Sequence, residues 1–553
     1  MGDMNKAILK TFLLAACMIS AGAAPGAEVD TMCANAEFKE TCKKTLSDAQ
    51  SSEPKGLLLS SFNTTVENLR TAITTSKTDG KFADSSKTYQ DASTDQRTKG
   101  ALVVCEQVLN TTVDNIKRSM AKVDKFEVSD VDGYVDDVKV WLSAGVTCKD
   151  TCIDAFENTT GETGEKIKEL LKTSGELLSN GLAIVDGVAK LFEALDLGKL
   201  FSGSKRVLRQ KVHAGVPDFV DPHKRSLLGA APGKFTPNAV VALDGSGKYK
   251  TIGAAIAAAP INSTKLFIIQ IKVGVYKEVV TVPGGANNVV LVGEGPTKTV
   301  ISGSQSFVSG IPTFQTATLA VDGDDFMAKD IKIENSAGAS GRQAIAVRVS
   351  GDKAVFYNVE MSGHQSTLYA HIYRQFYRDC HISGTMDIIW GDAEAVFQNC
   401  VVAVKQPLPN QDCTVTAQAR NDSRAVGVTV LQNCSITVEK EFFAVKPAAK
   451  AYLGRPMKAF SRTIVMESNI DGFISPEGWT PWMGTFGLDT LYYGEYKNRG
   501  KGAATAKRVT WKGIQKMTPD LADKFTPAKV YDGDDSWVKN TAIPYVGGMV
   551  NPK

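Results

Sequence analysis

The feature that most constrains this fold is a sequence motif that recurs through the second half of the chain: an apolar, strand-like run that leads to Asn or Asp. It occurs at Asp330 (FMAKDIKI), Asn358 (FYNVEM), Asp379 (FYRDCHI), Asn399 (FQNCVV), Asn433 (LQNCSI) and Asn469 (VMESNI). The successive intervals are 28, 21, 20, 34 and 36 residues. A repeat of about 20 residues with larger insertions is typical of a solenoid of stacked β-strands, whereas a β-sandwich turns every 8–12 residues or so. We therefore expect a coiled β-solenoid whose wall forms a long groove suited to a polymer.

The first half has a different period. Residues 28–200 contain stretches, such as 56–76 and 165–197, in which apolar residues recur every three or four positions. This spacing gives a helix one buried stripe, so we predict an antiparallel helical bundle. The 553 residues are enough for at least two cores, and a net charge of only +3 excludes a strongly basic nucleic-acid-binding protein.

Residues 1–27 are typical of a secretory signal. Lys6 and Lys10 precede an apolar run at 11–20, and small residues follow at 21–27. The apolar run is shorter than the roughly 20 residues that span a membrane, so we expect export and no membrane attachment after signal removal. Residues 201–228 carry two basic pairs in a Pro- and Gly-containing segment, which favours a linker cut by a processing protease.

Ten cysteines in an exported chain indicate disulfides rather than metal ligands. No C-x-x-C pair occurs, and only five histidines are present, so we expect no structural zinc site. Glycosylation acceptor triplets are compatible with the secretory route and begin at Asn63, Asn110, Asn158, Asn262 and Asn421.

The candidate chemistry lies around residues 363–400. Asp387 stands in an apolar setting, TMDIIWG, where its charge is costly unless a cation is near, and Arg455 in YLGRP is a candidate cation. The amides of Gln343 and Gln365 could donate to a developing oxyanion. With a repeat of about 20 residues, Gln365 and Asp387 fall on adjacent turns. Each residue also has a structural interpretation, as a strand cap or an ordinary ion pair.

Longer stretches carry a resemblance to a known family. They are DGSGKYKTI (244–252), GVYKE (274–278), RQFYRDC (374–380), VTAQ (415–418), YLGRP (452–456), LYYGEY (491–496) and the closing PYVGG. With these motifs, residues 229–553 resemble plant pectin methylesterases. Residues 28–200 resemble the inhibitor domain that often precedes these enzymes, through Cys33, Cys42, Cys105 and the Thr151-Cys152 pair. RSLL at 225–228 resembles the family's maturation site, and KRVL at 205–208 a weaker second one.

The resemblance implies a right-handed parallel β-helix that hydrolyses the methyl esters of cell-wall pectin without metal or cofactor. Asp387 would be the nucleophile that forms an acyl-enzyme, and Arg455 would hold it ionised. Gln365 would stabilise the oxyanion, while Gln343 and Thr313 would contact substrate. The first half would be an inhibitor-like pro-domain that partners the second.

The resemblance also implies the disulfides. It pairs Cys400 with Cys434, Cys33 with Cys42, and Cys105 with Cys152. Cys148 and Cys413 remain unassigned.

Three positions depart from the family pattern. Ser366 stands where the family has the aspartate of Gln-Asp-Thr-Leu, the general acid that protonates departing methanol and then activates water. A serine hydroxyl does neither well, so activity could be impaired. Met457 replaces a tryptophan that would stack on a sugar ring, and Trp390 replaces a phenylalanine.

Neither of two substitutes for the missing acid is favoured. Asp392 and Glu394 add carboxylates nearby, but their side-chain parity differs from that of Asp387 unless the chain turns at Gly391. Ser366 could be a nucleophile paired with His364, but nothing in the sequence orients that histidine.

Three hypotheses follow. The chain is an exported pectin methylesterase whose rate Ser366 could reduce; a catalytically inactive pectin-binding or regulatory homologue; or an inhibitor of other esterases through residues 28–200. The retained Asp387, Arg455, Gln343 and Gln365 favour the first two, because an inhibitor has no need of them.

Overall fold

The computed structural model describes residues 27–51, 53–78, 95–125, 131–194, 236–445, 448–532 and 534–550. The chain divides into two compact units, one formed mainly by residues up to 219 and one mainly by the residues after them. The predicted signal at 1–27, apart from its last residue, and the predicted linker at 201–228 lie outside the described residues. None of the described helices is both long enough and apolar enough to cross a membrane.

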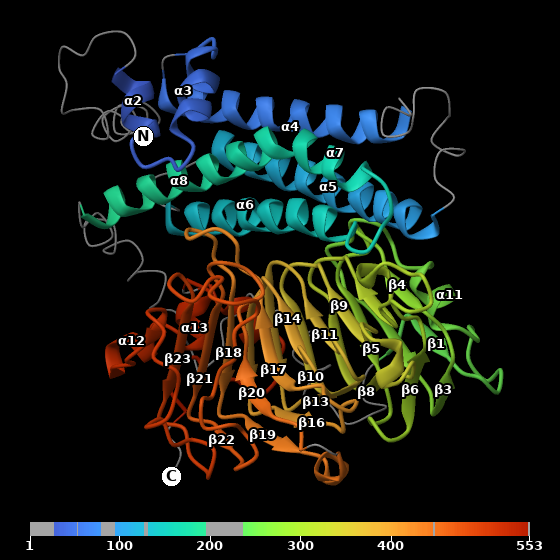
Figure 1. Ribbon diagram of the computed structural model, residues 1–553. Helices are drawn as coiled ribbons and strands as arrows, with labels where there is room; N and C mark the ends of the chain where they lie inside the picture. The colour runs from blue at the N-terminus through green and yellow to red at the C-terminus, as the bar shows by residue number, and fades with distance from the viewer. Residues whose placement is uncertain are drawn as a thin grey trace, which may run out of the picture. The chain divides into compact units, whose positions relative to one another are not determined.

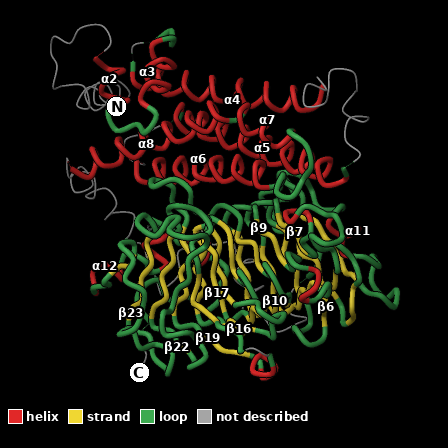
Figure 2. Tube along the Cα trace, viewed as in Figure 1, coloured by secondary structure: helices red, strands yellow, loops and turns green. Residues whose placement is uncertain are grey.

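The first unit is a helical bundle, as predicted. Its described helices are α2 (Ala27–Cys33), α3 (Lys39–Ser47), α4 (Pro54–Thr78), α5 (Gln96–Asp124), α6 (Val131–Asp154), α7 (Thr163–Leu170) and α8 (Lys172–Ala194). Helices α4 and α6 each contact both α5 and α8, so the four long helices close a bundle (Figures 1 and 2). Buried residues recur along α5 every three or four positions, at Ala101, Val104, Val108, Thr112 and Ile116. This is the single apolar stripe that the sequence predicts.

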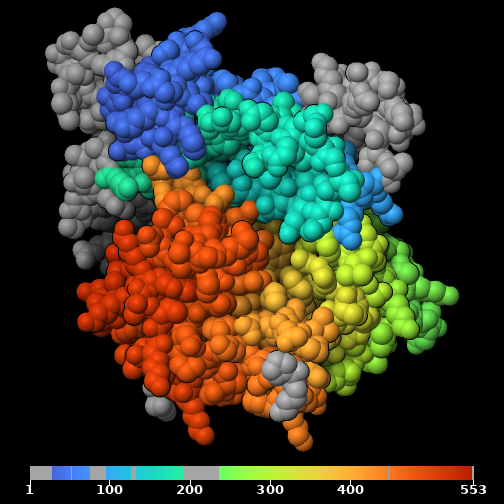
Figure 3. Space-filling model, viewed as in Figure 1, coloured from blue at the N-terminus to red at the C-terminus, as the bar shows by residue number. Residues whose placement is uncertain are grey.

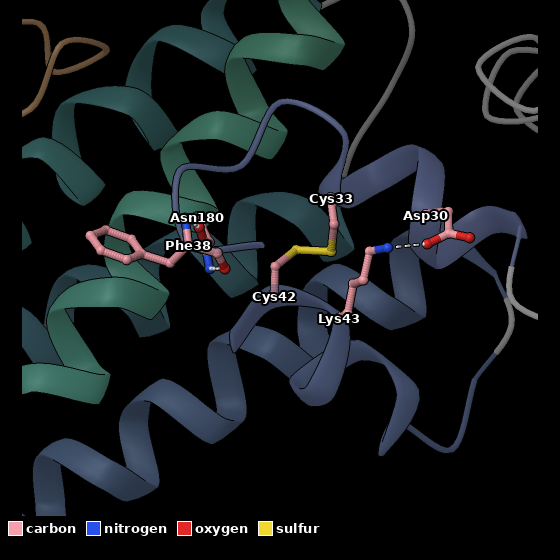
Figure 4. Close-up of a disulfide and its surroundings, with 6 residues drawn as sticks. All are labelled: Asp30, Cys33, Phe38, Cys42, Lys43 and Asn180. Atoms are coloured by element: carbon pink, nitrogen blue, oxygen red, sulfur yellow. Dashed lines mark hydrogen bonds and ion pairs between the residues drawn. A yellow bond between two sulfur atoms is a disulfide. The ribbon is translucent and has the colours of Figure 1, made fainter. Parts of the chain in front are cut away.

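Two disulfides join parts of this unit, and both confirm predicted pairs. Cys33–Cys42 closes the short connection between α2 and α3, and Cys105–Cys152 joins α5 to α6. In Figure 4 the side chain of Asn180 on α8 reaches this connection: its Nδ2 donates to the carbonyl of Phe38 at 2.9 Å, and its Oδ1 accepts from the Phe38 N–H at 3.2 Å. The amide pairs with the loop as a neighbouring strand would, which fixes the loop against α8.

The disulfide between α5 and α6 is expected to stabilise the bundle most. Cys105–Cys152 closes a loop of 47 residues, whereas Cys33–Cys42 closes a loop of nine. The loop-entropy relation gives stabilisations of about 4 kcal/mol for the first disulfide and about 2.6 kcal/mol for the second. Urea unfolding of Cys105→Ala/Cys152→Ala should therefore show a loss of about 4 kcal/mol. Cys148→Ala is the matched control, because it removes a buried cysteine that is not in a disulfide from the same helix and should cost about 1 kcal/mol. Equal losses in the two variants would contradict the cross-link argument.

The second unit is a parallel β-helix, as predicted, with strands on three faces. Face 1 contains β1 (Ala239–Val241), β2 (Phe267–Ile271), β5 (Val289–Val292), β12 (Arg374–Arg378), β15 (Glu394–Gln398), β18 (Val428–Gln432), β21 (Arg462–Met466), β23 (Tyr492–Tyr496) and β24 (Ile514–Gln515). Face 2 contains β3 (Gly274–Tyr276), β6 (Thr299–Gly303), β13 (His381–Gly384), β16 (Val401–Val404), β19 (Ser435–Val438) and β22 (Asn469–Ile470). The long strands β8 (Met327–Asn335) and β10 (Ala354–Ser362) run through both faces. Face 3 contains β4 (Val280–Val282), β7 (Leu319–Val321), β9 (Val347–Val349), β11 (Leu368–Ala370), β14 (Ile389–Gly391), β17 (Cys413–Gln418) and β20 (Ala451–Gly454).

Every strand pairing in this unit is parallel, and the turns stack in chain order. In the space-filling view the colour of the second unit accordingly changes in sequence from green through yellow and orange to red (Figure 3). The register repeats after about 20 residues where turns are short, as between Arg374 and Glu394, and after 34 residues between Phe397 and Leu431. Tyr377 stacks between the rings of Phe356 and Phe397 inside the coil, with interplanar angles of 9° and 8°. Like residues on successive turns therefore form ladders.

The recurring sequence motif lies at the corner between faces 1 and 2. Asp330, Asn358, Asp379, Asn399 and Asn433 all have φ between 51° and 60°. Asn and Asp tolerate this left-handed conformation better than most residues, which explains why they recur there. Some also bond along the ladder, as Asn433 Nδ2 does to Asn399 Oδ1 at 3.2 Å. The sixth predicted position is wrong: Glu467, with φ of 54°, takes the corner two residues before Asn469.

The structure also corrects the predicted Cys400–Cys434 disulfide. Both residues are free thiols, and with Cys380 they follow the corner residue on three successive turns. The Cys400 thiol donates to the carbonyl of Tyr377 at 3.5 Å, and the Cys434 thiol to that of Phe397 at 3.3 Å. The ladder gives Cys400 one cysteine on each side, and backbone carbonyls satisfy the thiols. Burial raises the pKa of the Cys380 and Cys434 thiols well above the usual range.

The C-terminal segment covers the outer side of face 1. It contains the short helices α12 (Pro519–Asp523), α13 (Pro527–Val530) and α14 (Ser536–Lys539), from which Val530, Trp537 and Val538 pack on the strands. Beyond them, backbone groups of Val546 and Gly548 bond the side chains of Gln398 and Gln432. The outer side of face 1 is therefore covered by the chain itself.

Candidate active site

The predicted ion pair lies at the edge of face 3. Asp387 occupies the turn between β13 and β14 with φ of 50° and is only 6% exposed. Arg455 follows β20, and the two side chains form a bidentate pair: Nε to Oδ1 at 2.8 Å and Nη2 to Oδ2 at 2.6 Å. Parallel charge-assisted hydrogen bonds of this kind fix the orientation of both side chains. The structure thus brings together two residues that are 68 positions apart in the sequence.

A second partner of Asp387 was not predicted. Thr414 in β17 accepts a hydrogen bond from the Asp387 N–H through Oγ1, and its hydroxyl donates to Asp387 Oδ1, both at 2.8 Å. Its contact with Asp387 follows from the register of face 3: Ile389 lies opposite Thr416, so two residues back Asp387 lies opposite Thr414. Only a correct alignment of turns of unequal length would have found it.

Gln343, Gln365 and Ser366 lie on the neighbouring turns. Gln343 and Gln365 form an isolated parallel bridge. The pairing of Leu368 with Ile389, extended two residues back, places Ser366 opposite Asp387, and the Ser366 N–H donates to Met386 O at 2.9 Å. Position 366, rather than 365, is therefore directly across from Asp387. The Gln343 Oε1 atom is buried without a hydrogen-bond partner among the described residues.

Aromatic side chains line the same face. Arg348, Tyr369 and Trp390 are in register on successive strands, and the rings of Tyr369 and Trp390 stack at 3.5 Å. The Trp390 Nε1–H donates to Ser366 O at 3.4 Å, a contact that phenylalanine could not make. Trp482, which was not predicted, lies over the Arg455 guanidinium at 4.1 Å. Stacking on the guanidinium fixes the plane in which Arg455 meets the carboxylate.

The two remaining predicted contact residues flank this surface. Thr313 begins the short 3-10 helix η2 (Thr313–Gln315), beside Phe314, whose ring meets that of Tyr369 edge-on at 6.3 Å. Met457 is half-buried two residues after Arg455, and its N–H donates to Gln418 O at 3.2 Å. No flat ring replaces the tryptophan at position 457, although Trp482 supplies one nearby.

The extra carboxylates of Asp392 and Glu394 are engaged elsewhere. The chain does turn at Gly391, where φ is 119°, and this turn carries both residues toward face 1. Asp392 Oδ1 accepts from Gln418 Nε2 at 2.9 Å, and Glu394 lies opposite Arg374 in the β12–β15 pairing. Burial lowers the pKa of the Arg462 guanidinium, and the charges of Glu394 and Asp392 offset only part of this lowering. Carboxylates that are engaged on this other face are poor substitutes for a general acid at position 366.

A buried histidine supports this face. His371 Nδ1 is 2.9 Å from Ser350 Oγ, and its ring contacts those of Phe314 and Tyr369. Burial, and secondarily the charge of Arg348, hold the pKa of His371 well below its usual value. The folded protein therefore keeps this imidazole neutral.

The buried histidine predicts a loss of stability in acid. The contribution of His371 to the unfolding free energy is fully present above about pH 6.5, where the imidazole is neutral in the unfolded chain as well. It is lost progressively at lower pH, because only the unfolded chain takes up the proton. The unfolding free energy should fall by up to about 1.4 kcal/mol per pH unit from this residue. Urea unfolding from pH 7.5 to 4.5 should show a flatter dependence for His371→Gln. The partly exposed His381 gives the control variant, His381→Gln, which should follow the parent. Parallel curves for parent and His371→Gln would contradict this assignment.

Comparison with known proteins agrees with the fold of both units. The family model described as Pectinesterase matches residues 238–534, and the one described as Plant invertase/pectin methylesterase inhibitor matches residues 27–184. A pectinesterase from Petunia integrifolia is 49% identical over 384 residues, which cover 69% of this chain and 99% of that protein. Pectinesterase 1 from Citrus sinensis is 37% identical, with 86% of this chain and 82% of that protein covered. The solved structure of pectin methylesterase from carrot is 45% identical, with a TM-score of 0.56 and coverage of 57% of this chain and 98% of that one.

Across the described ranges, no group of three or more His, Cys, Asp or Glu residues is placed to hold a metal ion. The site is instead a carboxylate clamped by a guanidinium on a parallel β-helix, beside two glutamine amides and an aromatic surface. On the strength of both family matches and of this fold, the chain belongs to the pectinesterase family of carboxylic ester hydrolases and carries a pectin methylesterase inhibitor domain before its β-helix.

Proposed function

We propose that this chain hydrolyses the methyl esters of galacturonate in pectin, with Asp387 as the nucleophile and with a rate limited by the serine at position 366. The observation that carries the proposal is the bidentate pair of Asp387 and Arg455 at the edge of face 3. Two parallel hydrogen bonds hold this nearly buried carboxylate in one orientation, which is what a nucleophile requires.

The reaction takes two steps. A carboxylate oxygen of Asp387 bonds to the ester carbonyl carbon, the bond to the methoxy oxygen breaks, and the methoxide takes a proton from water and leaves as methanol. The remaining hydroxide attacks the acyl carbon and breaks its bond to Asp387, which restores the carboxylate and releases galacturonic acid; the acid then loses its proton to water. In both steps negative charge develops on the carbonyl oxygen, and the Gln365 amide is the donor assigned to stabilise it.

The neighbouring residues would hold the polymer. The unpartnered Gln343 Oε1 can accept from a sugar hydroxyl. The partly buried Trp482 offers apolar ring surface for a sugar ring, with Thr313 and Met457 as further contact residues, while the buried stack of Tyr369 and Trp390 lies beneath. Together they would position an ester group over Asp387.

Ser366 is the reason to expect a slow enzyme. It lies opposite Asp387, where an aspartate could donate a proton to methoxide and then take one from water. Its hydroxyl does neither near neutral pH. The same observation favours the second candidate function, a homologue that binds pectin without turning it over.

The biological setting belongs to the same proposal. Residues 1–27 would direct export to the cell wall, a processing protease would cut within 201–228, and the helical unit would act as an inhibitor-like pro-domain. These assignments rest on the sequence and on the family.

The test is methanol release from methyl-esterified pectin by the secreted full-length chain, with Asp387→Asn as control. We expect slow release that the control lacks. Binding of pectin with no methanol from either the parent or Ser366→Asp would replace the proposal by the binding function.

A further inference from the structure

We propose that Thr414 is a positioning residue that determines which oxygen of Asp387 attacks the ester. This inference rests on the proposed function, because it specifies the nucleophile of the same reaction. It comes from the hydrogen bonds of a single hydroxyl group.

The direction of the Thr414 hydroxyl is fixed by its two partners. The Asp387 N–H donates to Oγ1, so the hydroxyl hydrogen must point elsewhere, and Oδ1 of the same aspartate receives it at 2.8 Å. A threonine hydroxyl has one hydrogen to give and accepts through its lone pairs, so both bonds form together. Thr414 is 2% exposed, which protects this arrangement from competing water.

The two carboxylate oxygens of Asp387 are therefore unequal. Oδ1 accepts from Thr414 and from Arg455 Nε, whereas Oδ2 accepts only from Arg455 Nη2 among the described donors. Each carboxylate oxygen has about two lone-pair directions. Both directions of Oδ1 are used, and one direction of Oδ2 remains for the carbonyl carbon. The geometry thus makes Oδ2 the attacking atom.

The same contact holds the backbone of the nucleophile. Asp387 is in the left-handed region, and its N–H bonds a side chain rather than a strand carbonyl. The next residue, Ile388, donates to the Thr414 carbonyl at 3.2 Å. Thr414 therefore holds two consecutive peptide groups, one through its side chain and one through its backbone. Without the hydroxyl, both the carboxylate and the turn are freer to move.

Two substitutions separate this role from packing. Thr414→Val keeps the shape and removes the hydroxyl, while Thr414→Ser keeps the hydroxyl and removes a methyl group. In the full-length Ser366→Asp protein, we expect Thr414→Val to lower kcat by about 10²-fold, the scale of a nucleophile misplaced by about 1 Å, with KM nearly unchanged. Thr414→Ser should retain most of kcat. Thr429→Val, at a buried threonine in β18 on face 1, is the control and should match its parent.

A second measurement does not depend on turnover. Hydrogen exchange of the Asp387 amide should be faster in Thr414→Val than in the parent and unchanged in Thr414→Ser, because only valine removes its acceptor. If Ser366→Asp releases no methanol, the proposed function fails, and the exchange rates alone then decide the role of Thr414. Normal exchange in Thr414→Val overturns the inference. The inference is also overturned if Thr414→Val keeps kcat and Thr414→Ser lowers it, because kcat would then depend on the shape of the side chain and not on its hydroxyl.

Discussion

Ser366→Asp is expected to raise the rate of methanol release from methyl-esterified pectin by about 10²–10⁴-fold, the usual contribution of a general acid. Position 366 lies opposite Asp387 on the adjacent turn, so the new carboxyl would stand beside the departing methoxide. The nearby Asp387 carboxylate would favour the protonated form of the new carboxyl group, which could then donate its proton to the methoxide. The backbone is suited to the change, since φ is 66° and aspartate tolerates this conformation better than serine.

The measurement is kcat and KM for methanol release by full-length parent and variant proteins, with Ser366→Asn as the matched control. Asparagine has the shape of aspartate but cannot exchange a proton near neutral pH, so its rate should stay near that of the parent. Most of the gain should be in kcat, because the proton is needed in the chemical steps rather than in binding. Equal rates for Ser366→Asp and Ser366→Asn would mean that the missing acid does not limit this enzyme.

Much of the fold was predictable because backbone strain selects residue types. The corner between faces 1 and 2 requires a positive φ on every turn, and the residues that tolerate it, Asp330 and Asn358 among them, show the repeat in the sequence. The prediction failed at Glu467, a residue with no such preference, where the nearby Asn469 drew the assignment instead. The helices of the first unit were predictable because apolar residues recur every three or four positions, a pattern that can be read within each helix alone.

The candidate site was predictable only in part. Asp387 and Arg455 could be named from motifs, but Thr414 could not, because its contact depends on how turns of 20 and 34 residues align. The cysteines show the same limit. A ladder places Cys400 between two other cysteines, and nothing in their spacing says whether a bond forms.

Arg455→Met, made in the Ser366→Asp protein, is expected to lower kcat by about 10³-fold. The guanidinium supplies two of the three hydrogen bonds to the carboxylate, and its loss leaves a nearly buried anion held by Thr414 alone. Removing one preorganised donor from a reacting group costs about 10²–10³ in kcat, and here two are lost together. Methionine keeps the length and most of the bulk of arginine, so the packing under Trp482 is largely retained.

Arg455→Lys provides the graded control for this prediction. Lysine restores the positive charge but cannot form the two parallel bonds, so kcat should recover only partly, to within about 10–100-fold of the arginine protein. The stability of the same variants tests the electrostatic cause. Arg455→Met should lower the unfolding free energy by about 3 kcal/mol, because it breaks a nearly buried pair and strands the carboxylate. Adding Asp387→Asn should recover most of that loss, since no charge then remains to be compensated. A kcat for Arg455→Met within a few fold of its parent would show that the Asp387 carboxylate needs no guanidinium partner and would contradict this prediction.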